Sequence, residues 1–347
     1  MITGLLHTRN RPGFLMRAIG YYDGKIEHPV LVLDASDAEH RERIQSGLLG
    51  LRLTYPLQVM LHSASTPMYE RLGDALLQVL TPYVMLMADD DLYYTEWMKS
   101  AVAFLDSNSS VGTVYGHTVI FQLTSYEPFG ALERFLISAP NPVARWLEQE
   151  TPAERLLELG KGPWTTTGWY SIQRTSILRE IVSAAQEARL DADMFERTLN
   201  LLQPIYGKVV MLDSVYVARQ IDPNQCRKPS TFKANEGSLA KLREIGRARL
   251  VQHASINTTE AERIVDSTMR AEILQLKRND ARERLCIPYW KSKLRPIQGL
   301  VTSLKGLPQK LSQVDPLAPD ARFPANPLLT ETHTCIQILR SACASGQ

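Results

Sequence analysis

The chain has 347 residues, of which 44% are hydrophobic and 22% are charged, and its formal net charge is +2. This composition excludes a chain too polar to bury a core, and the small charge excludes recruitment of nucleic acid or membrane by a global electrostatic field. The length predicts one large α/β domain with an appendage, or two domains.

The few cysteines predict a reducing compartment. The chain has four cysteines, none of them in a C-x-x-C pair: Cys226, Cys286, Cys335 and Cys343. So few cysteines in a chain of this length are not typical of a disulfide scaffold. The first residues lack a basic leader with a long apolar stretch, and the longest apolar runs are too short to cross a bilayer. We therefore expect a cytoplasmic protein, soluble or peripheral at the inner face of the membrane.

The first part of the chain alternates short apolar runs with helical patterns. In chain order these patterns predict a strand at 1–7, a helix at 14–22, strands at 29–33 and 57–61, a helix at 69–80, a strand at 83–87, a helix at 95–105 and a strand at 111–115. Continuously apolar strands that alternate with helices predict a mostly parallel sheet with helices on both of its faces.

The second part is less regular. Prolines punctuate residues 125–169. Helices are then predicted at 176–188 and 193–202, a strand at 208–212 and an edge strand at 215–218. Two long charged helices follow, at 238–253 and 259–284, and the remainder of the chain lacks a clear period.

Polar clusters follow two of the predicted strands, Thr8 to Arg11 and Asp89 to Asp91. In open α/β sheets ligands bind outside the carboxyl ends of the strands. Three adjacent carboxylates repel one another unless a cation intervenes, and Mg²⁺ or Mn²⁺ takes such oxygen ligands together with substrate phosphates. We expect Asp89 and Asp91 to point the same way while Asp90 diverges. The alternative is a solvated acidic turn that caps the next helix.

Other nucleotide-binding patterns are absent from the sequence. No G-x-G-x-x-G follows the first strand, and no G-x-x-x-x-G-K-[ST] occurs in the chain. The acidic cluster also follows the fourth strand, whereas a haloacid-dehalogenase-type phosphatase carries its D-x-D after the first. Of the nucleotide-site types considered, this leaves a nucleoside-diphosphate site made by the first loop and the acidic turn.

These residues resemble the GT-A-fold glycosyltransferases, especially the inverting family 2. The stretch from His7 to Pro12, H-T-R-N-R-P, is similar to the P-T-x-N-R-P start of that family, Asp34 to its base-binding aspartate, and Asp89 to Asp91 to its D-x-D. The resemblance covers residues 1–220. It implies a nucleotide-sugar donor bound by Thr8, Arg9, Arg11, Asp34, Asp89 and Asp90, and a Mn²⁺ or Mg²⁺ ion held by Asp91 with Asp89. Arg219 would neutralise the leaving group, although a surface arginine is as plausible.

A sugar acceptor is expected in the second half. The stretch W-T-T-T-G-W, with Trp164, Thr167, Gly168 and Trp169, offers indole faces and hydroxyls, as a sugar-binding loop does. An ordinary turn with a core tryptophan is the alternative.

Inverting transfer needs a carboxylate base that deprotonates the acceptor hydroxyl. The resemblance places this base near Arg197, where Asp191 fits by spacing and Asp193 by its position at the start of a predicted helix. Leucine at 190 departs from the glutamate of the family pattern. Either aspartate could instead cap the helix.

Residues 285–314 contain five lysines and arginines, no acidic residue, and interleaved apolar side chains. Such a segment suits the surface of an anionic membrane. Packing against the catalytic domain or a partner subunit explains it as well, which leaves homo-oligomerisation open.

The sequence thus predicts an α/β GT-A catalytic domain at 1–222, with a nucleotide-binding half at 1–120 and an acceptor-binding half at 121–222. A helical region follows at 223–347. The predicted reaction is metal-dependent, inverting transfer of a sugar from a nucleotide-diphosphate-sugar, a UDP-sugar first, to a hydroxyl of a glycan or lipid-linked saccharide. A nucleotidyltransferase is one alternative, although its usual Gly-rich loop and lysine are missing. A catalytically inactive GT-A-like scaffold is the other.

Overall fold

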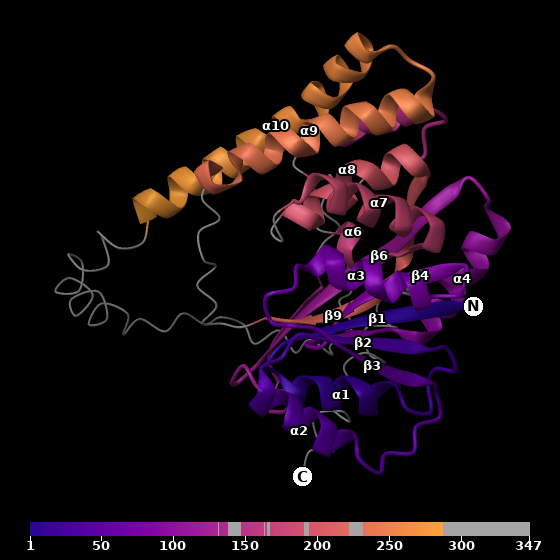
Figure 1. Cartoon of the computed structure of the whole chain (residues 1–347), viewed down its shortest axis with the longest axis vertical. Helices are drawn as coiled ribbons and strands as arrows, with labels where there is room; N and C mark the ends of the chain where they lie inside the picture. Colours follow the sequence, from indigo (N-terminus) through magenta and orange to yellow (C-terminus); the bar gives the residue numbers. More distant parts are fainter. Residues whose placement is uncertain are drawn as a thin grey trace, which may run out of the picture.

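The strands of the computed structural model form one sheet with helices on both of its faces (Figure 1). The structure describes residues 1–130, 132–137, 147–162, 164, 167–190, 194–221 and 232–286. The strands are β1 (Ile2–Thr8), β2 (Val30–Asp34), β3 (Leu57–Leu61), β4 (Tyr83–Ala88), β5 (Asp91–Tyr93), β6 (Val111–Leu123), β7 (Leu132–Ile137), β8 (Ile172–Arg174) and β9 (Lys208–Gln220). The helices are α1 (Pro12–Tyr22), α2 (Ala38–Leu48), α3 (Met68–Gln78), α4 (Thr95–Ser107), α5 (Pro152–Leu159), α6 (Thr167–Tyr170), α7 (Thr175–Ala188), α8 (Phe195–Tyr206), α9 (Phe232–Ala254) and α10 (Thr258–Cys286).

The sheet order is β3-β2-β1-β4-β8-β6-β9-β5, and β7 pairs with β6. The strands β1 to β4 pair in parallel, as predicted. The short strand β8 lies between β4 and β6 and runs antiparallel to both, and β5 runs antiparallel to β9. The α/β fold is therefore confirmed, with a mixed sheet in place of a mostly parallel one.

Neighbouring residues of the first strands point to opposite faces of the sheet. Leu6 of β1 packs in a core cluster with residues of α1, α2 and α4, whereas Leu5 packs in a second cluster with residues of α3 and α7. Both side chains are fully buried. Because both faces are covered, these strands are apolar along their whole length instead of alternating.

The long helices α9 and α10 lie outermost on the α3, α7 and α8 side of the sheet (Figure 1). Leu242 of α9 and Ile264 of α10 belong to the same core cluster as Leu178 of α7 and Leu201 of α8. The predicted C-terminal helices are thus confirmed. The predicted boundary at residue 222 lies outside the described residues, as does the basic segment beyond Cys286. Among the described helices, none has an apolar stretch long enough to span a bilayer.

Two predicted strand segments are longer in the structure. The strand predicted at 111–115 continues to Leu123, and those at 208–212 and 215–218 merge into β9. These two strands pair in parallel with register shifts around His117. The shifts explain why a simple period did not reveal their full length.

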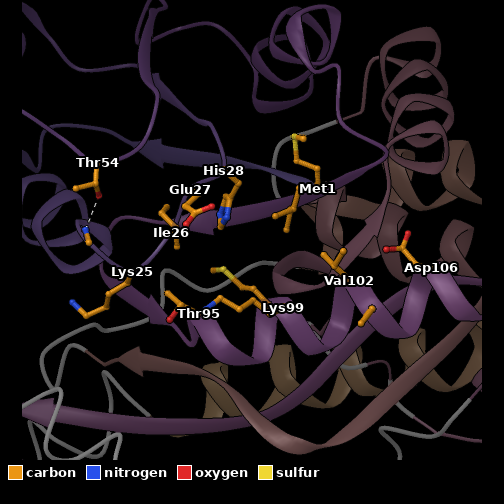
Figure 2. Close-up of a pocket in the computed structure, with 14 residues that line it drawn as sticks. Met1, Lys25, Ile26, Glu27, His28, Thr54, Thr95, Lys99, Val102 and Asp106 are labelled. Atoms are coloured by element: carbon orange, nitrogen blue, oxygen red, sulfur yellow. Dashed lines mark hydrogen bonds between the residues drawn. The ribbon is translucent and has the colours of Figure 1, made fainter.

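The amino ends of β1 and β2 open onto a pocket of about 770 Å³ (Figure 2). Ile2 and His28 line it from the sheet side, and Lys99, Val102 and Asp106 of α4 line it from the other. This pocket lies at the edge of the sheet opposite to the polar clusters of the sequence.

Candidate functional site

The loops after β1 and β2 are tied to each other at the carboxyl edge of the sheet. The backbone N–H of Asn10 donates to Ser36 Oγ at 2.8 Å, and Asn10 Oδ1 accepts the backbone N–H of Asp37 at 2.9 Å. Asn10 has a φ of 58°, a left-handed conformation that asparagine tolerates better than most residues. The turn leads into Arg11, the residue directly before α1. The side chain of Arg11 reaches Asp90, which follows β4.

Asp34 closes β2 and is completely buried. Its Oδ1 accepts the backbone N–H of Ser36 at 2.8 Å, but its Oδ2 has no hydrogen-bond partner. Arg41 Nε lies 3.8 Å from that oxygen. A buried carboxylate oxygen without a donor is costly, so a ligand with an N–H or O–H group would be stabilised here.

Positive charge gathers beside Asp34. Burial lowers the pKa of Arg71, and the exposed Arg9 lowers it further, whereas Asp34 raises it. The Nε of Arg71 is buried without a hydrogen-bond partner. An anion between the loops would stabilise the charged form of Arg71.

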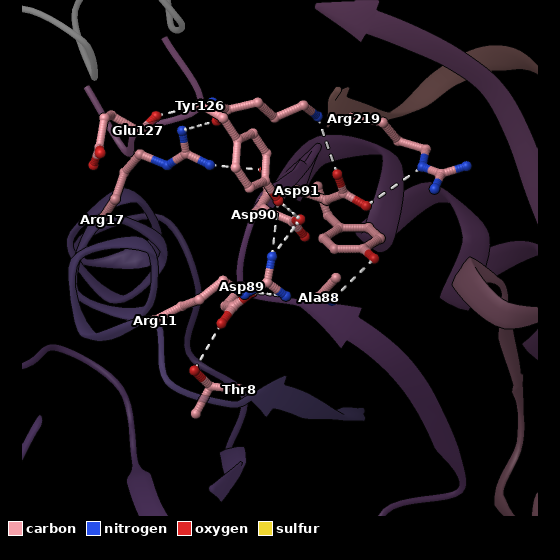
Figure 3. Close-up of polar contacts among 12 residues, drawn as sticks. Thr8, Arg11, Arg17, Ala88, Asp89, Asp90, Asp91, Tyr126, Glu127 and Arg219 are labelled. Atoms are coloured by element: carbon pink, nitrogen blue, oxygen red, sulfur yellow. Dashed lines mark hydrogen bonds and ion pairs between the residues drawn. The ribbon is translucent and has the colours of Figure 1, made fainter. Parts of the chain in front are cut away.

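The end of β4 is joined to the first loop by a group of polar contacts (Figure 3). Thr8 Oγ1 donates to Asp89 Oδ2 at 2.7 Å. Arg11 uses its two terminal nitrogens separately, with Nη2 at 2.8 Å from Asp89 Oδ1 and Nη1 at 2.7 Å from Asp90 Oδ2. The hydroxyl of Tyr126 accepts from Arg11 Nη1 at 2.9 Å and donates to Asp90 Oδ2 at 2.6 Å. One guanidinium therefore holds two carboxylates of the acidic turn.

Asp91 faces a different part of the site. It is the first residue of β5 and pairs with Arg219 of β9 in the antiparallel register. Its Oδ1 accepts the backbone N–H of Gln220 at 3.1 Å, and its Oδ2 lies 3.5 Å from Arg219 Nε. The sequence predicted that Asp89 and Asp91 point the same way. The structure differs, because the pairing of β5 with β9 directs Asp91 toward β9 while Asp89 and Asp90 share Arg11.

Arg17 of α1 links these groups to the loop after β6. Its Nη2 donates to the carbonyl of Asp90 at 2.7 Å, and its Nη1 donates to Gln220 Oε1 at 2.5 Å and to the carbonyl of Pro128 at 2.8 Å. The buried guanidinium thus fixes the backbone of the acidic turn against β9 and the loop after β6 (Figure 3).

Burial dominates the electrostatics of the acidic turn. It raises the pKa of Asp89 to about 7, although Arg11 and Thr8 favour the charged form, and it raises the pKa of Asp91 as well. Burial by itself lowers the pKa of Arg11, but the carboxylates of Asp89 and Asp90 raise it overall. Buried carboxylates of raised pKa bind cations strongly in place of protons, and such groups cluster at functional sites.

His7 connects this edge to the second half of the fold. Its ring lies 5.5 Å from that of Trp169, which in turn contacts Phe195 of α8 edge-on at 5.8 Å. Burial lowers the pKa of His7 to about 3, helped by Arg71 and His62, and neither ring nitrogen has a hydrogen-bond partner. A neutral imidazole without a hydrogen-bond partner therefore lies beside an indole, next to the loop after β1.

The predicted acceptor residues are not all in one place. Trp169 belongs to α6 and lies near His7, and Gly168 packs so closely on α8 that a Cβ would meet Gln203 Oε1 at 2.7 Å. Trp164 is buried in the core shared with α10, and its backbone N–H donates to Glu272 at 3.1 Å. Thr167 begins α6. Trp169 is the one of these residues that the structure places near the first loop.

The two candidate bases, Asp191 and Asp193, lie outside the described residues. Their assignment stays a prediction. The helix that follows them, α8, begins at Phe195, whose ring contacts Trp169.

The acidic turn offers the kind of ligand atoms that a divalent cation binds. Asp89 and Asp90 direct oxygens at one shared cationic group, and hard cations such as Mg²⁺ and Mn²⁺ prefer carboxylate oxygens. Across the part of the chain that the structure describes, no three His, Cys, Asp or Glu side chains gather into a complete metal site. An ion would thus need further oxygen ligands from a bound molecule or water. Asp91 as a metal ligand stays a prediction.

Sequence reasoning missed Arg17, Tyr126 and Gln220. The sequence around Arg17 did carry a signal. Arg17 lies on the helix face that also buries Leu15 and Ile19, and a charged residue in such a position needs a polar partner. Tyr126 and Gln220 carried none, since the contacts that bring them to the acidic turn span 36 and 129 residues.

Comparisons with known proteins identify the fold. No protein-family model and no curated protein sequence matches the chain. Among solved structures, TarS 1–349 from S. aureus is similar with a TM-score of 0.51 and 15% identity, over 100% of this chain and 92% of that chain. The same protein in complex with UDP-GlcNAc gives a TM-score of 0.54 and 15% identity, over 99% and 90%.

A further solved structure is the mannosyltransferase PcManGT from Pyrobaculum calidifontis in complex with GDP-Man and Mn²⁺, with a TM-score of 0.45 and 12% identity over 99% of this chain and 86% of that chain. The similarity to TarS confirms the expected GT-A type of fold. The assignment to family 2 stays a prediction.

Proposed function

We propose that the chain is a glycosyltransferase that transfers a sugar from a nucleoside-diphosphate-sugar to a hydroxyl acceptor. The observation that carries the proposal is the junction at the carboxyl edge, where Thr8 and Arg11 from the first loop hold Asp89 and Asp90 from the end of β4. Ligands of open α/β sheets bind at this edge. The fold is similar to that of TarS, whose structure contains UDP-GlcNAc, and a UDP-sugar is therefore the first donor to test.

In this proposal the first two loops bind the donor. The unpartnered Oδ2 of Asp34 accepts a hydrogen bond from the nucleoside. Arg9 and Arg11 attract the diphosphate, since an arginine offers several N–H donors to phosphate oxygens. Arg219 stacks on Tyr170 at 4.4 Å beside Asp91 and adds positive charge for the leaving group.

A divalent ion, Mn²⁺ or Mg²⁺, would be held by Asp89, together with Asp90 in the arrangement seen here or with Asp91 as the resemblance implies. When bound, it would offset negative charge on the leaving diphosphate. The buried Thr8 keeps Asp89 oriented by its hydrogen bond, and Arg17 holds the backbone of the turn.

The acceptor would enter on the side of Trp169 and His7. An indole face packs against sugar C–H groups. The neutral His7 can give or take a hydrogen bond without adding charge. Asp193 or Asp191 would act as the base that takes the proton of the acceptor hydroxyl, which gives inversion at the anomeric carbon. The acceptor class that we propose is a glycan or lipid-linked saccharide.

A screen of nucleotide-sugars tests the proposal. The purified protein is incubated with UDP-, GDP- and other activated sugars with Mn²⁺, and release of the nucleoside diphosphate is followed, with and without EDTA. We expect slow, metal-dependent hydrolysis of one donor, because water replaces the absent acceptor. Binding of a donor without any turnover favours the inactive scaffold, and pyrophosphate-forming turnover with a sugar phosphate and a nucleoside triphosphate favours the nucleotidyltransferase. No binding of any nucleotide-sugar overturns the proposal.

A further inference from the structure

The side chain of Arg11 lies where a cation shared by Asp89 and Asp90 would lie. Its Nη2 is 2.8 Å from Asp89 Oδ1, and its Nη1 is 2.7 Å from Asp90 Oδ2 (Figure 3). The two oxygens belong to adjacent residues at the end of β4, and the guanidinium bridges them. It therefore acts as the counter-ion of the carboxylate pair in the structure.

A divalent ion bound to these two oxygens would compete with the guanidinium for the same negative charge. Carboxylate oxygens bind Mg²⁺ and Ca²⁺ at roughly 2.0–2.6 Å, inside the distance at which Arg11 now contacts them. Two positive groups at that separation in a largely buried site would also repel one another strongly. Binding of the ion to the pair is thus unfavourable while Arg11 stays in this position.

The side chain of Arg11 is less constrained than that of Asp89. The side chain of Asp89 is fully buried and held by Thr8, whereas the side chain of Arg11 is 35% exposed and extends from a loop. The guanidinium also donates to the hydroxyl of Tyr126 and lies over the ring of Phe14, at 5.7 Å from its centroid. Arg11 can therefore follow an incoming anion while the carboxylates stay in place, and a diphosphate offers a guanidinium several charged oxygens to bind.

From this geometry, and resting on the proposed function, we infer that Arg11 is a built-in cation that blocks metal binding to the Asp89 and Asp90 pair until a nucleoside diphosphate draws it away. Metal and nucleotide then bind cooperatively, because each favours the same position of one side chain. Reciprocity requires that the nucleotide strengthen metal binding by the same factor as the metal strengthens nucleotide binding.

Calorimetric titration of Mn²⁺ without nucleotide tests the block alone. The variants are Arg11→Gln, Arg11→Lys, and Arg43→Gln as a control that removes the same charge from an exposed position of α2. We expect Arg11→Gln to bind Mn²⁺ about tenfold more tightly than the wild type, with Arg43→Gln unchanged and Arg11→Lys in between. Thermal melts with circular dichroism confirm that each variant is folded. Equal Mn²⁺ affinity in the wild type and Arg11→Gln overturns the inference, as does an equal gain in Arg43→Gln.

A second titration adds UDP at saturation. The wild type should then bind Mn²⁺ about tenfold more tightly than without UDP, whereas Arg11→Gln should gain clearly less, because it has no guanidinium to displace. An equal gain in both proteins contradicts the inference. Failure of UDP to bind any of the proteins counts against the proposed function instead, and the titration without nucleotide still decides the role of Arg11.

Discussion

The two edges of the same parallel strands are built differently. At the carboxyl edge of β1 and β4, Arg11 contacts Asp89 and Asp90 across 78 or 79 positions of the chain. At the amino edge, the charges around the pocket of Figure 2 are satisfied nearby, as Lys25 is by the carbonyl of Tyr21 and Lys99 by Glu96.

The two edges differ in where buried charged groups meet. The carboxyl edge brings buried carboxylates and arginines from separate loops into one place, at the cost of raised carboxylate pKa values. The amino edge has a pocket of about 770 Å³, but its charged side chains are exposed or locally paired. A cavity alone is therefore a weaker guide to function than charges that the fold has forced together.

The largest expected effect comes from Asp89→Asn. The substitution keeps the shape of the side chain but removes the charge that Thr8 and Arg11 orient, so we expect turnover of the nucleotide-sugar to fall by about 100-fold or more. Asp106→Asn, which alters the partner of the Tyr83 hydroxyl at the amino edge, is the matched control and should keep wild-type turnover. Similar turnover rates for Asp89→Asn and Asp106→Asn would contradict the assignment of the active site to the carboxyl edge.

Asp91 should affect stability as well as activity. Replacement by alanine leaves the buried N–H of Gln220 and the guanidinium of Arg219 without their partner, so the free energy of unfolding should fall by about 1–3 kcal/mol. Asp91→Asn keeps an acceptor oxygen and should lose less. Urea denaturation measures both, and an Asp91→Ala protein as stable as the wild type would show that these contacts contribute nothing.

The pH dependence of stability should carry a contribution from His7. Its folded pKa of about 3 lies below the ordinary value of 6.5, so the unfolded chain binds a proton that the folded chain does not. Stability from this group is present above pH 6.5 and is lost as the pH falls, by at most about 1.4 kcal/mol per unit. Asp89 acts in the opposite sense between pH 4 and 7, because its folded pKa is raised.

His7→Phe isolates that contribution. Urea denaturation between pH 4 and 7 should show a flatter loss of stability on acidification than in the wild type. His28→Phe at the amino edge should flatten the curve too, since burial lowers the pKa of His28 to about 4. An unchanged acid limb in His7→Phe would mean that this imidazole is protonated in the folded protein.

The smallest effect is expected from Lys99→Ala. Lys99 is an exposed residue of α4 whose ammonium contacts Glu96 one turn away. Its removal should leave both the affinity for UDP and the turnover unchanged, as calorimetry and the hydrolysis assay would show. A clear loss of affinity for UDP would indicate that the nucleotide binds at the amino edge.

Much of the carboxyl edge could be predicted from the sequence, because buried strands end abruptly in polar residues at Thr8, Asp34 and Asp89. Such local patterns reveal which residues end a strand. They do not reveal which residues meet there. The contacts of Tyr126, Arg17 and Gln220 depend on how β5, β6 and β9 pair, and no short pattern encodes that pairing.

Some structure was overlooked despite a local signal. Helix α5 begins with a capping box, in which Thr151 and Glu154 satisfy each other's backbone N–H groups and Pro152 takes the first helical position. Strand β8 gave no such signal, since three residues are too few to show a period. It is nonetheless the strand that joins β4 to β6, and it runs antiparallel to both.

Hydrogen–deuterium exchange with UDP and Mn²⁺ tests the central claim most directly, because it locates the nucleotide on the protein. We expect slower amide exchange at residues 8–12, 34–37 and 88–91, with no change at residues 24–28 and 95–106 around the amino-edge pocket. Protection of the pocket residues, with the residues of the carboxyl edge unaffected, would contradict it.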